Sequence, residues 1–392
     1  MKIHTKAVHV GDRKKAGAHV PSTTPIHTAT SYFYESMEQL DRIFGGEEQG
    51  YCYFRYDNPS AAALEELLCS LESGAAALAC ASGMAALHTA IACALADRRK
   101  SVLAASAMYG ATTTLLMNVF EPAGVNVRFV DICDLDAIRA AIAEEKPGCI
   151  VMEIISNPLL RVGPLDRIAE LAREVGAAVV VDSTFGTPLL TRPLELGAHF
   201  SVHSLTKYLS GHGDVMGGAV ITDRDHAESL RALGRTLGPV LGPFESYLTM
   251  RGIKTFPLRM ERQCANACRV AQFLASHPRV ERVYFTGDPR HPDAENIRRL
   301  FPANLFGAMI SFEIRDAGRD EVFRFMDALK MIVRATSLGD VHTMALYPVM
   351  SSHRELSPKH RERMGIRENL VRLSVGIEAP EDIIADLESA LG

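Results

Sequence analysis

The sequence predicts an α/β protein with a mostly parallel seven-stranded sheet, followed by a smaller α+β C-terminal domain. From about residue 61, short apolar or β-branched runs alternate with stretches of helical spacing. This alternation is typical of parallel sheets that are covered by helices on both faces. Near residue 245 the alternation gives way to a long helical stretch, and a second set of patterns follows. We therefore expect an N-terminal arm at 1–60, a large domain at 61–250 and a C-terminal domain at 251–392.

Seven apolar runs are the expected strands of the large sheet, and helical spacing separates several of them. The runs are Ala75–Ala79, Ser101–Ala105, Asn126–Val130, Cys149–Ile155, Ala177–Val181, Phe200–His203 and Gly218–Thr222. The expected helices between them include Ala85–Ala96, Asp134–Glu145 and Asp166–Val175. In such sheets ligands bind beyond the carboxyl ends of the strands. The residues that follow each run are therefore the first candidates for function.

The two ends of the chain have different patterns. The first sixty residues contain several prolines, glycines and tyrosines and lack a regular period. A long irregular segment usually has a function or lies on another subunit, so we expect an extended arm. In the C-terminal part, helices are expected at Glu245–Ser276 and Glu381–Leu391 and strands at Ala308–Ile314 and Leu370–Val375.

Composition excludes several classes of protein. The 392 residues are 47% hydrophobic and 23% charged with a net charge of −5, which gives no basic surface for nucleic acid. No apolar run approaches a membrane span, and the first residues do not resemble a secretory leader. The eight cysteines include no CxxC pair, and the 14 histidines include no HExxH motif. We expect a reduced cytoplasmic protein that binds neither membrane, nucleic acid nor metal.

A Ser-Gly turn follows the first predicted strand. Ser82, Gly83 and Met84 stand directly before a predicted helix. The first backbone N–H groups of a helix are unpaired and lie at the positive end of its dipole, which favours an anion there. The simpler interpretation is that Ser82 only caps the helix.

Two ionisable residues follow later strands. Asp182 ends the Ala177–Val181 run, where it could bind a metal, a ribose or a protonated ring nitrogen, or only cap a turn. Lys207 follows the next strand, close to Ser204 and Thr206. In a desolvated pocket a lysine becomes a nucleophile for Schiff-base chemistry, whereas most lysines simply extend into solvent.

Together these features indicate a pyridoxal-phosphate site. The phosphate needs an anion site, the pyridine nitrogen needs an acid beside it, and the aldehyde needs a lysine. The hydroxyls of Ser204 and Thr206 could bind one phosphate. Nucleotide alternatives are disfavoured, because no GxGxxG follows a strand and no GxxxxGK is present.

The segment Ser201–His212 closely resembles the lysine signature of the Cys/Met-metabolism pyridoxal-phosphate enzymes. This transsulfuration family includes cystathionine γ-synthase, cystathionine lyases, methionine γ-lyase and O-acylhomoserine sulfhydrylases. The resemblance covers nearly the whole chain and implies the fold type I, aspartate-aminotransferase-like architecture. The other matching segments are Tyr51–Ser60, Ala81–Met84, Met108–Gly110, Ser156–Pro158, Val181–Thr184 and Arg372–Gly376.

The resemblance implies a role for each matching residue. Lys207 would hold the cofactor and move protons, Tyr109 would stack on its ring and assist proton transfer, and Asp182 would pair with its ring nitrogen. Arg372 would bind the substrate carboxylate, with Asn157 and Ser337 nearby. The implied phosphate ligands are Ser82, Gly83, Met84, Ser204 and Thr206, with Tyr53 and Arg55 reaching the cofactor of a neighbouring subunit.

The resemblance further implies a homotetramer, built as a dimer of dimers with active sites shared across subunits. The implied activity is γ-elimination on L-cystathionine, L-methionine or homocysteine, giving 2-oxobutyrate, ammonia and a thiol. The alternative is γ-replacement, as in cystathionine γ-synthase or O-acylhomoserine sulfhydrylase. Other pyridoxal-phosphate reactions and a non-catalytic protein on the same fold are further alternatives.

Two positions bear on which member the chain resembles. Ala111 stands where methionine γ-lyases usually carry a cysteine, which argues against efficient methionine cleavage. His342 stands where several relatives carry a glutamate, and an imidazole there would alter recognition of the distal amino group of cystathionine.

Overall fold

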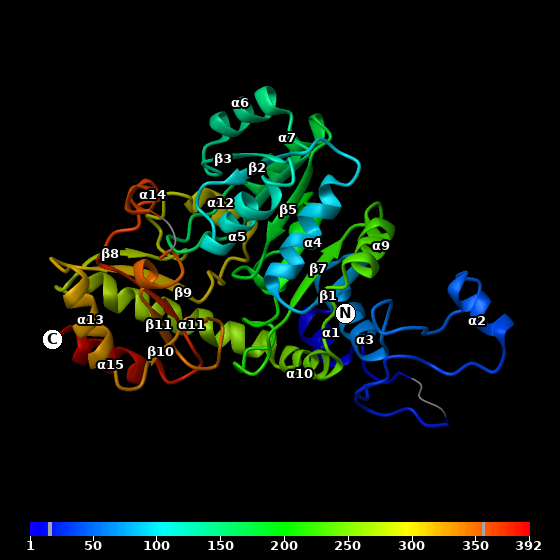
Figure 1. The fold of residues 1–392 in the computed structure, drawn as a ribbon. Helices are drawn as coiled ribbons and strands as arrows, with labels where there is room; N and C mark the ends of the chain where they lie inside the picture. Colours follow the sequence, from blue (N-terminus) through cyan, green and yellow to red (C-terminus); the bar gives the residue numbers. More distant parts are fainter. Residues whose placement is uncertain (15–17, 355–356) are drawn as a thin grey trace.

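Two β-sheets organise the chain, one in each half of the sequence (Figure 1). The computed structural model describes residues 1–14, 18–354 and 357–392. Within these ranges, no helix combines the length and the apolar character that a membrane crossing requires. The eight cysteines all fall in the described ranges and are free.

The large sheet has seven strands in the order β1-β7-β6-β5-β4-β2-β3. All neighbouring strands pair in parallel, except that β7 runs antiparallel to both β1 and β6. The predicted mostly parallel sheet is therefore confirmed. Its strands are β1 (Ala76–Cys80), β2 (Ser101–Ala105), β3 (Asn126–Val130), β4 (Cys149–Glu153), β5 (Ala178–Asp182), β6 (Phe200–Ser204) and β7 (Gly218–Thr222).

Helices cover this sheet and explain why its central strands are mostly apolar. The helix α4 packs against β1 and β4 to β7, and α6 and α7 contact each other and other strands of the sheet (Figure 1). Strands that are covered on both faces contain continuous apolar runs, as the buried Ala178–Val181 does. The helices in this half are α3 (Pro59–Glu72), α4 (Gly83–Leu95), α5 (Gly110–Leu115), α6 (Leu135–Glu145), α7 (Leu165–Glu174), α8 (Thr187–Leu190), α9 (Ala227–Leu237) and α10 (Pro243–Ile253), with a π-helical turn at Leu116–Phe120 and a 3-10 turn at Pro193–Leu196.

Local signals set several helix boundaries. Asp134 caps α6, its side chain accepting from the N–H groups of Asp136 and Ala137. The predicted helical region Glu245–Ser276 consists of two helices, α10 and α11 (Phe256–Ser276). Pro257 stands in the first turn of α11, where its missing N–H is tolerated but a continuous helix through it is not.

The N-terminal segment is less irregular than predicted. The helix α1 (Ile3–His9) packs against α3 and α11, so the first residues belong to the body of the molecule. Further along, α2 (Met37–Phe44) has Ser36 as its N-cap and lies far from the body (Figure 1). Both helices are short, and α2 buries no residue. Neither therefore shows the repeating apolar positions from which a helix can be predicted. The segment around Thr24 also packs on the body, since its hydroxyl donates to the Gly11 carbonyl and the residue is buried. The part that carries α2 projects (Figure 1).

The second sheet has five strands in the order β10-β11-β12-β9-β8, antiparallel except for the β10–β11 pair. The helices α11, α13 and α15 pack together beside it. Its strands are β8 (Val280–Tyr284), β9 (Met309–Ile314), β10 (Val333–Arg334), β11 (Met344–Leu346) and β12 (Leu370–Ser374), and the helices in this half are α11, α12 (Ala294–Leu300), α13 (Arg319–Ala328), α14 (Pro358–Arg363) and α15 (Pro380–Leu391), with a 3-10 turn at Pro348–Met350.

Each sheet has its own apolar core. The first core runs from Ala7 to Cys264 and also includes residues of α12, and the second begins at Ala267 and continues to Leu391. The long helix α11 contributes its N-terminal half to the first core and its C-terminal half to the second. The face between the two sheets is where the carboxyl ends of β4, β5 and β6 meet the C-terminal half.

Candidate active site

A cavity of about 470 Å³ lies at the carboxyl ends of the central strands, within the range of small-molecule sites. The large-domain sheet supplies most of its wall, and Thr336, Leu338, Leu346, Ser351 and Ser352 close it from the C-terminal half. Ten of the residues predicted from the sequence line it: Ser82, Gly83, Met84, Tyr109, Asn157, Asp182, Ser204, Thr206, Lys207 and Arg372.

The Ser-Gly turn is both a helix cap and part of the cavity wall. The Ser82 hydroxyl accepts from the N–H of Ala85 at 3.1 Å, which confirms the cap. At Gly83, a Cβ would lie 2.9 Å from the Cβ of Ser204, so only glycine lets this turn approach the β6 loop so closely. The start of α4 and the hydroxyl residues after β6 therefore face one end of the cavity together. This is the arrangement that a phosphate group needs.

Asp182 is the last residue of β5, and its exposed part faces the cavity. Its Oδ1 accepts from the N–H of Thr184 at 2.9 Å. Burial raises the pKa of Asp182, while the hydrogen bonds from Thr184 and the nearby His203 lower it. Among the described residues none forms an ion pair with Asp182, and a protonated ring nitrogen would supply its cation.

Lys207 points into the cavity rather than into solvent. Its Nζ donates to the Ser337 hydroxyl at 2.9 Å. Burial lowers the pKa of Lys207 to about 8, and the positive charge of Arg372 adds to this effect. Lowering the pKa increases the fraction of neutral amine, which is the nucleophilic form. Among the cavity residues, Lys207 is thus suited to Schiff-base chemistry.

Arg372 is a buried cation without a carboxylate. It is only 3% exposed, and burial lowers its pKa to about 10. Its Nη1 donates to Asn157 Oδ1 at 2.9 Å and its Nη2 to the Ser337 carbonyl at 3.4 Å. Its Nε is buried without a partner, and no described carboxylate forms an ion pair with the side chain. Such a guanidinium is prepared for a ligand carboxylate, which it can bind in bidentate geometry.

Tyr109 stands at the start of α5, with its ring 39% exposed. Its N–H donates to Glu153 Oε1 at 2.7 Å. The next residue, Gly110, lies against the C-terminal half, since a Cβ there would be 2.5 Å from the carbonyl oxygen of Ser352. This close contact places the Tyr109 ring at the cavity.

The sequence singles out neither Glu153 and Thr184 nor the five wall residues of the C-terminal half named above. Glu153 lies inside the predicted strand Cys149–Ile155, where a carboxylate near the end of an apolar run is the available signal. The Ser351–Ser352 segment carries no motif, because only the packing of the second half brings it here.

Within a single chain, Tyr53 and Arg55 do not reach the cavity. They lie on the projecting arm, where the Arg55 guanidinium sits over the rings of Tyr53 and Tyr56 at 5.7 and 5.1 Å. Arg55 also donates to the carbonyl oxygen of Arg235 at the end of α9. Their expected contact with a neighbouring subunit's cofactor stays a prediction.

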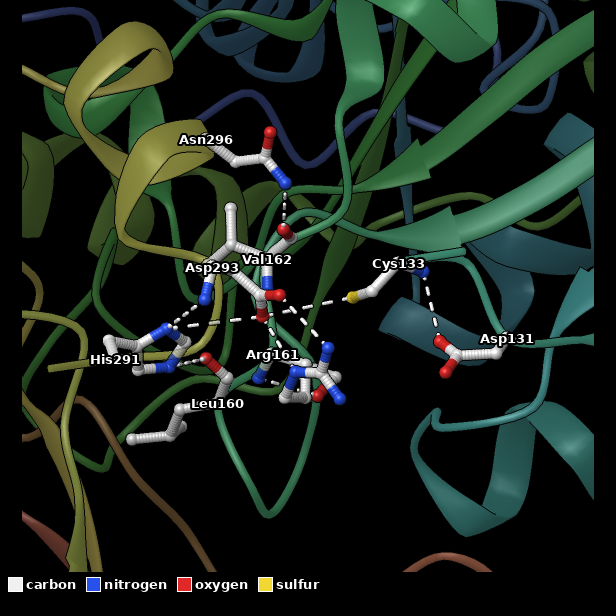
Figure 2. A network of polar contacts seen from close by, with 9 residues as sticks. Asp131, Cys133, Leu160, Arg161, Val162, His291, Asp293 and Asn296 are labelled. Atoms are coloured by element: carbon white, nitrogen blue, oxygen red, sulfur yellow. Dashed lines mark hydrogen bonds and ion pairs between the residues drawn. The ribbon is translucent and has the colours of Figure 1, made fainter. Parts of the chain in front are cut away.

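Behind the cavity, Arg161 forms an ion pair with Asp293, as expected of a structural arginine (Figure 2). Its Nε and Nη2 donate to the two carboxylate oxygens at 2.7 and 2.9 Å. The His291 ring contacts the Leu160 carbonyl at 3.1 Å. This network ties the loop that carries Asn157 to the C-terminal half of the chain.

A helix-capping Ser-Gly turn after β1, a buried aspartate at the end of β5 and a lysine with a lowered pKa after β6 define the class: a pyridoxal-phosphate-dependent enzyme of fold type I. The residues present fit this cofactor, since the cavity offers a partner for its phosphate, ring nitrogen and aldehyde. The family model of the Cys/Met metabolism PLP-dependent enzymes matches residues 4–392. The chain belongs to this family.

Three relatives illustrate its range. The chain is 40% identical to an L-methionine gamma-lyase of Fusobacterium nucleatum subsp. polymorphum, over 99% of this chain and 98% of that protein. It is 39% identical to a cystathionine beta-lyase of Coxiella burnetii, over 99% and 97%. The cystathionine gamma synthase of Xanthomonas oryzae pv. oryzae, solved in complex with cystathionine, superimposes with a TM-score of 0.92 at 33% identity, covering 100% and 98%.

Proposed function

We propose that the chain catalyses pyridoxal-phosphate-dependent γ-elimination on a sulfur amino acid, L-cystathionine, L-methionine or homocysteine. The products are 2-oxobutyrate, ammonia and a thiol. The observation that carries the proposal is the pairing in one cavity of a low-pKa lysine with a buried arginine that lacks a carboxylate. The first holds the cofactor, and the second recognises an α-amino acid.

Pyridoxal phosphate, when bound, withdraws electrons from the substrate's α-carbon and so makes its protons acidic. The protein's own groups do the rest. Lys207 would hold the cofactor, and its Nζ would accept the proton from the α-carbon of the substrate and then one from the β-carbon before the γ-substituent leaves. Asp182 keeps the ring nitrogen protonated. The Tyr109 ring stacks on the cofactor, and its hydroxyl assists proton transfer.

Polar groups of the protein would hold the cofactor at its phosphate and the substrate at its carboxylate. The start of α4 and the β6 loop bind the phosphate through Ser82, Gly83, Met84, Ser204 and Thr206. At the other end of the cavity Arg372 binds the substrate carboxylate, with Asn157 and Ser337 fixing the guanidinium. Holding the carboxylate would fix the orientation of the substrate's α-carbon, so that its C–H bond faces Lys207.

A second candidate is γ-replacement, in which an O-acylhomoserine is joined to cysteine or sulfide. The likeness to the Xanthomonas oryzae cystathionine gamma synthase favours it, as does Ala111 in place of the cysteine usual in methionine γ-lyases. The two reactions share every step up to the departure of the γ-substituent.

The test measures the release of 2-oxobutyrate by the cofactor-loaded enzyme. The substrates are L-cystathionine, L-methionine, homocysteine and O-acylhomoserines, each with and without cysteine. Release from L-cystathionine or L-methionine supports γ-elimination. Release from acylhomoserines alone, suppressed by cysteine as cystathionine accumulates, contradicts it and supports replacement.

We also propose that the protein is a cytoplasmic homotetramer, a dimer of dimers. In it, the N-terminal arm of one subunit completes the active site of a neighbouring subunit. The arm exposes large apolar side chains, with Phe33 93% and Met37 76% exposed, which favours burial against a second copy. Tyr53 and Arg55 then contact the partner's cofactor phosphate. Sedimentation of the holoenzyme gives the mass, and a monomer contradicts the shared site.

The division into an arm at 1–60, a cofactor domain at 61–250 and a C-terminal domain at 251–392 is likewise proposed. The two apolar cores support a separate C-terminal domain. The boundary at residue 250 falls within α10, and the change from one core to the other falls within α11, between Cys264 and Ala267. Limited proteolysis within the projecting arm should leave the remainder of the chain folded. Loss of all structure after such a cut would contradict this division.

A further inference from the structure

A chain of hydrogen bonds runs through the cavity wall behind the residues already described. Lys207 Nζ donates to the Ser337 hydroxyl at 2.9 Å, and Arg372 Nη2 donates to the carbonyl of the same serine at 3.4 Å. Arg372 Nη1 donates to Asn157 Oδ1 at 2.9 Å. Ser337 therefore connects Lys207 to Arg372 through hydrogen bonds.

Glu153 extends this chain to the aromatic side of the cavity. Its Oε2 accepts from the backbone N–H of Asn157 at 3.0 Å, and its Oε1 accepts from the backbone N–H of Tyr109 at 2.7 Å. One carboxylate thus joins two loops that are 48 residues apart along the chain, one after β2 and one after β4. The side chain lines the cavity, and the residue is only 8% exposed.

Burying the Glu153 carboxylate beside a second carboxylate is energetically unfavourable. It is the last residue of β4 and pairs in register with Asp182 on β5, so two carboxylates stand side by side at the buried end of the sheet. Burial and the charge of Asp182 both raise the pKa of Glu153, while its two backbone donors and the charge of Arg372 lower it. An apolar residue at this position would leave both backbone N–H groups without an acceptor, and an amide has one oxygen for the two.

We propose that Glu153 is a positioning residue, which holds Tyr109 and the Asn157–Arg372 pair at a fixed separation across the cavity. Each backbone N–H it accepts belongs to a residue that faces the bound ligands. The ring of Tyr109 and the guanidinium of Arg372 are therefore placed by one rigid bridge rather than by two independent loops. The role rests on the proposed function, in which these two groups contact cofactor and substrate.

The test compares Glu153→Gln and Glu153→Asp with a matched control, Glu313→Gln. Glutamine has one acceptor oxygen for two N–H donors, and aspartate keeps the charge but falls one methylene short. Glu313 is also buried, 1% exposed, and accepts from Tyr284 and Arg367 outside the cavity. Its variant therefore reports the general effect of neutralising a buried carboxylate.

Two measurements on the cofactor-loaded proteins serve as readouts. L-Norleucine, the carbon isostere of methionine, has no leaving group, so its dissociation constant reports carboxylate binding without turnover. The visible circular dichroism of the bound cofactor reports the orientation of the ring against Tyr109. Both Glu153 variants should weaken norleucine binding about tenfold, as loss of one hydrogen bond to a charged group predicts, and should change the circular dichroism band. Glu313→Gln should change neither.

Two results would overturn the role of Glu153. One is wild-type norleucine affinity and circular dichroism in Glu153→Gln, or equal changes in Glu313→Gln. The other is full rescue by Glu153→Asp, because charge rather than the bridge would then be what matters. Failure of the proposed function looks different: the wild-type enzyme would bind norleucine and yet release no 2-oxobutyrate from any of the proposed substrates.

Discussion

Replacing Arg372 by lysine isolates the geometry of carboxylate recognition from its charge. The guanidinium has its Nη1 and Nη2 on protein oxygens and a buried Nε without a partner, so it meets a ligand as a preorganised fork. Lysine keeps one positive charge on a single nitrogen. It cannot bond Asn157 and pair with a carboxylate in bidentate fashion at the same time.

The expected magnitude follows from the bonds lost. A hydrogen bond to a charged group contributes roughly 1.5–3 kcal/mol, so losing one lowers kcat/KM by roughly 10- to 150-fold. The loss should fall mainly on KM. Because the α-amide of the substrate lacks the negative charge, wild-type preference for L-methionine over L-methioninamide should shrink in Arg372→Lys.

The assay is steady-state release of 2-oxobutyrate, or of its α-amide, from the two substrates, with Arg367→Lys as the control. Arg367 pairs with Glu281 and Glu313 on the second sheet, outside the cavity, and its variant should keep the wild-type ratio. A KM for L-methionine within twofold of wild type in Arg372→Lys would refute the reasoning. So would an equal loss on the acid and the amide.

Three further predictions concern the cofactor. Arg55→Ala should weaken cofactor retention on dialysis without unfolding the subunit, and unchanged occupancy would count against the shared site. Asp182→Asn should retain the cofactor but lower kcat by about 100-fold or more, the size of a lost acid–base contribution; wild-type turnover would exclude its ring-nitrogen role. Burial lowers the pKa of Lys207 from 10.5 to about 8, so between these pH values the unfolded apoprotein binds more protons than the folded one. The free energy of unfolding of the apoprotein should therefore rise with pH through that range. Lys207→Met should abolish turnover, remove this rise with pH and increase the free energy of unfolding at pH 7 by up to ~3 kcal/mol. A wild-type free energy of unfolding in urea that does not change between these pH values would contradict the lowered pKa of Lys207.

The strands of the large sheet were predictable because most of them are buried and form short apolar runs. The runs Ser101–Ala105, Asn126–Val130 and Gly218–Thr222 coincide with β2, β3 and β7. Their direction was not predictable in the same way. That β7 lies antiparallel between β1 and β6 depends on the path of the chain between strands, which no local pattern records.

The candidate site was predictable where chemistry and strand ends coincide. Asp182 stands out because it directly follows an apolar run, and Lys207 because it stands in the short loop after the next one. Glu153 did not, since it ends its strand inside the run that was expected to continue to Ile155. The wall formed by Ser351 and Ser352 depends on packing between the two halves of the chain, and spacing along the sequence carries no information about it.

The central claim is that the bond at the γ-carbon breaks, and the keto acid formed from L-cystathionine tests it most directly. The purified, cofactor-loaded enzyme is incubated with L-cystathionine alone, and the keto acid and the thiol amino acid are identified by mass spectrometry. Cleavage at the γ-carbon gives 2-oxobutyrate with cysteine, which is the predicted result. Pyruvate with homocysteine would mean that the β-carbon bond breaks instead, and would contradict the proposed reaction while leaving the cofactor site intact.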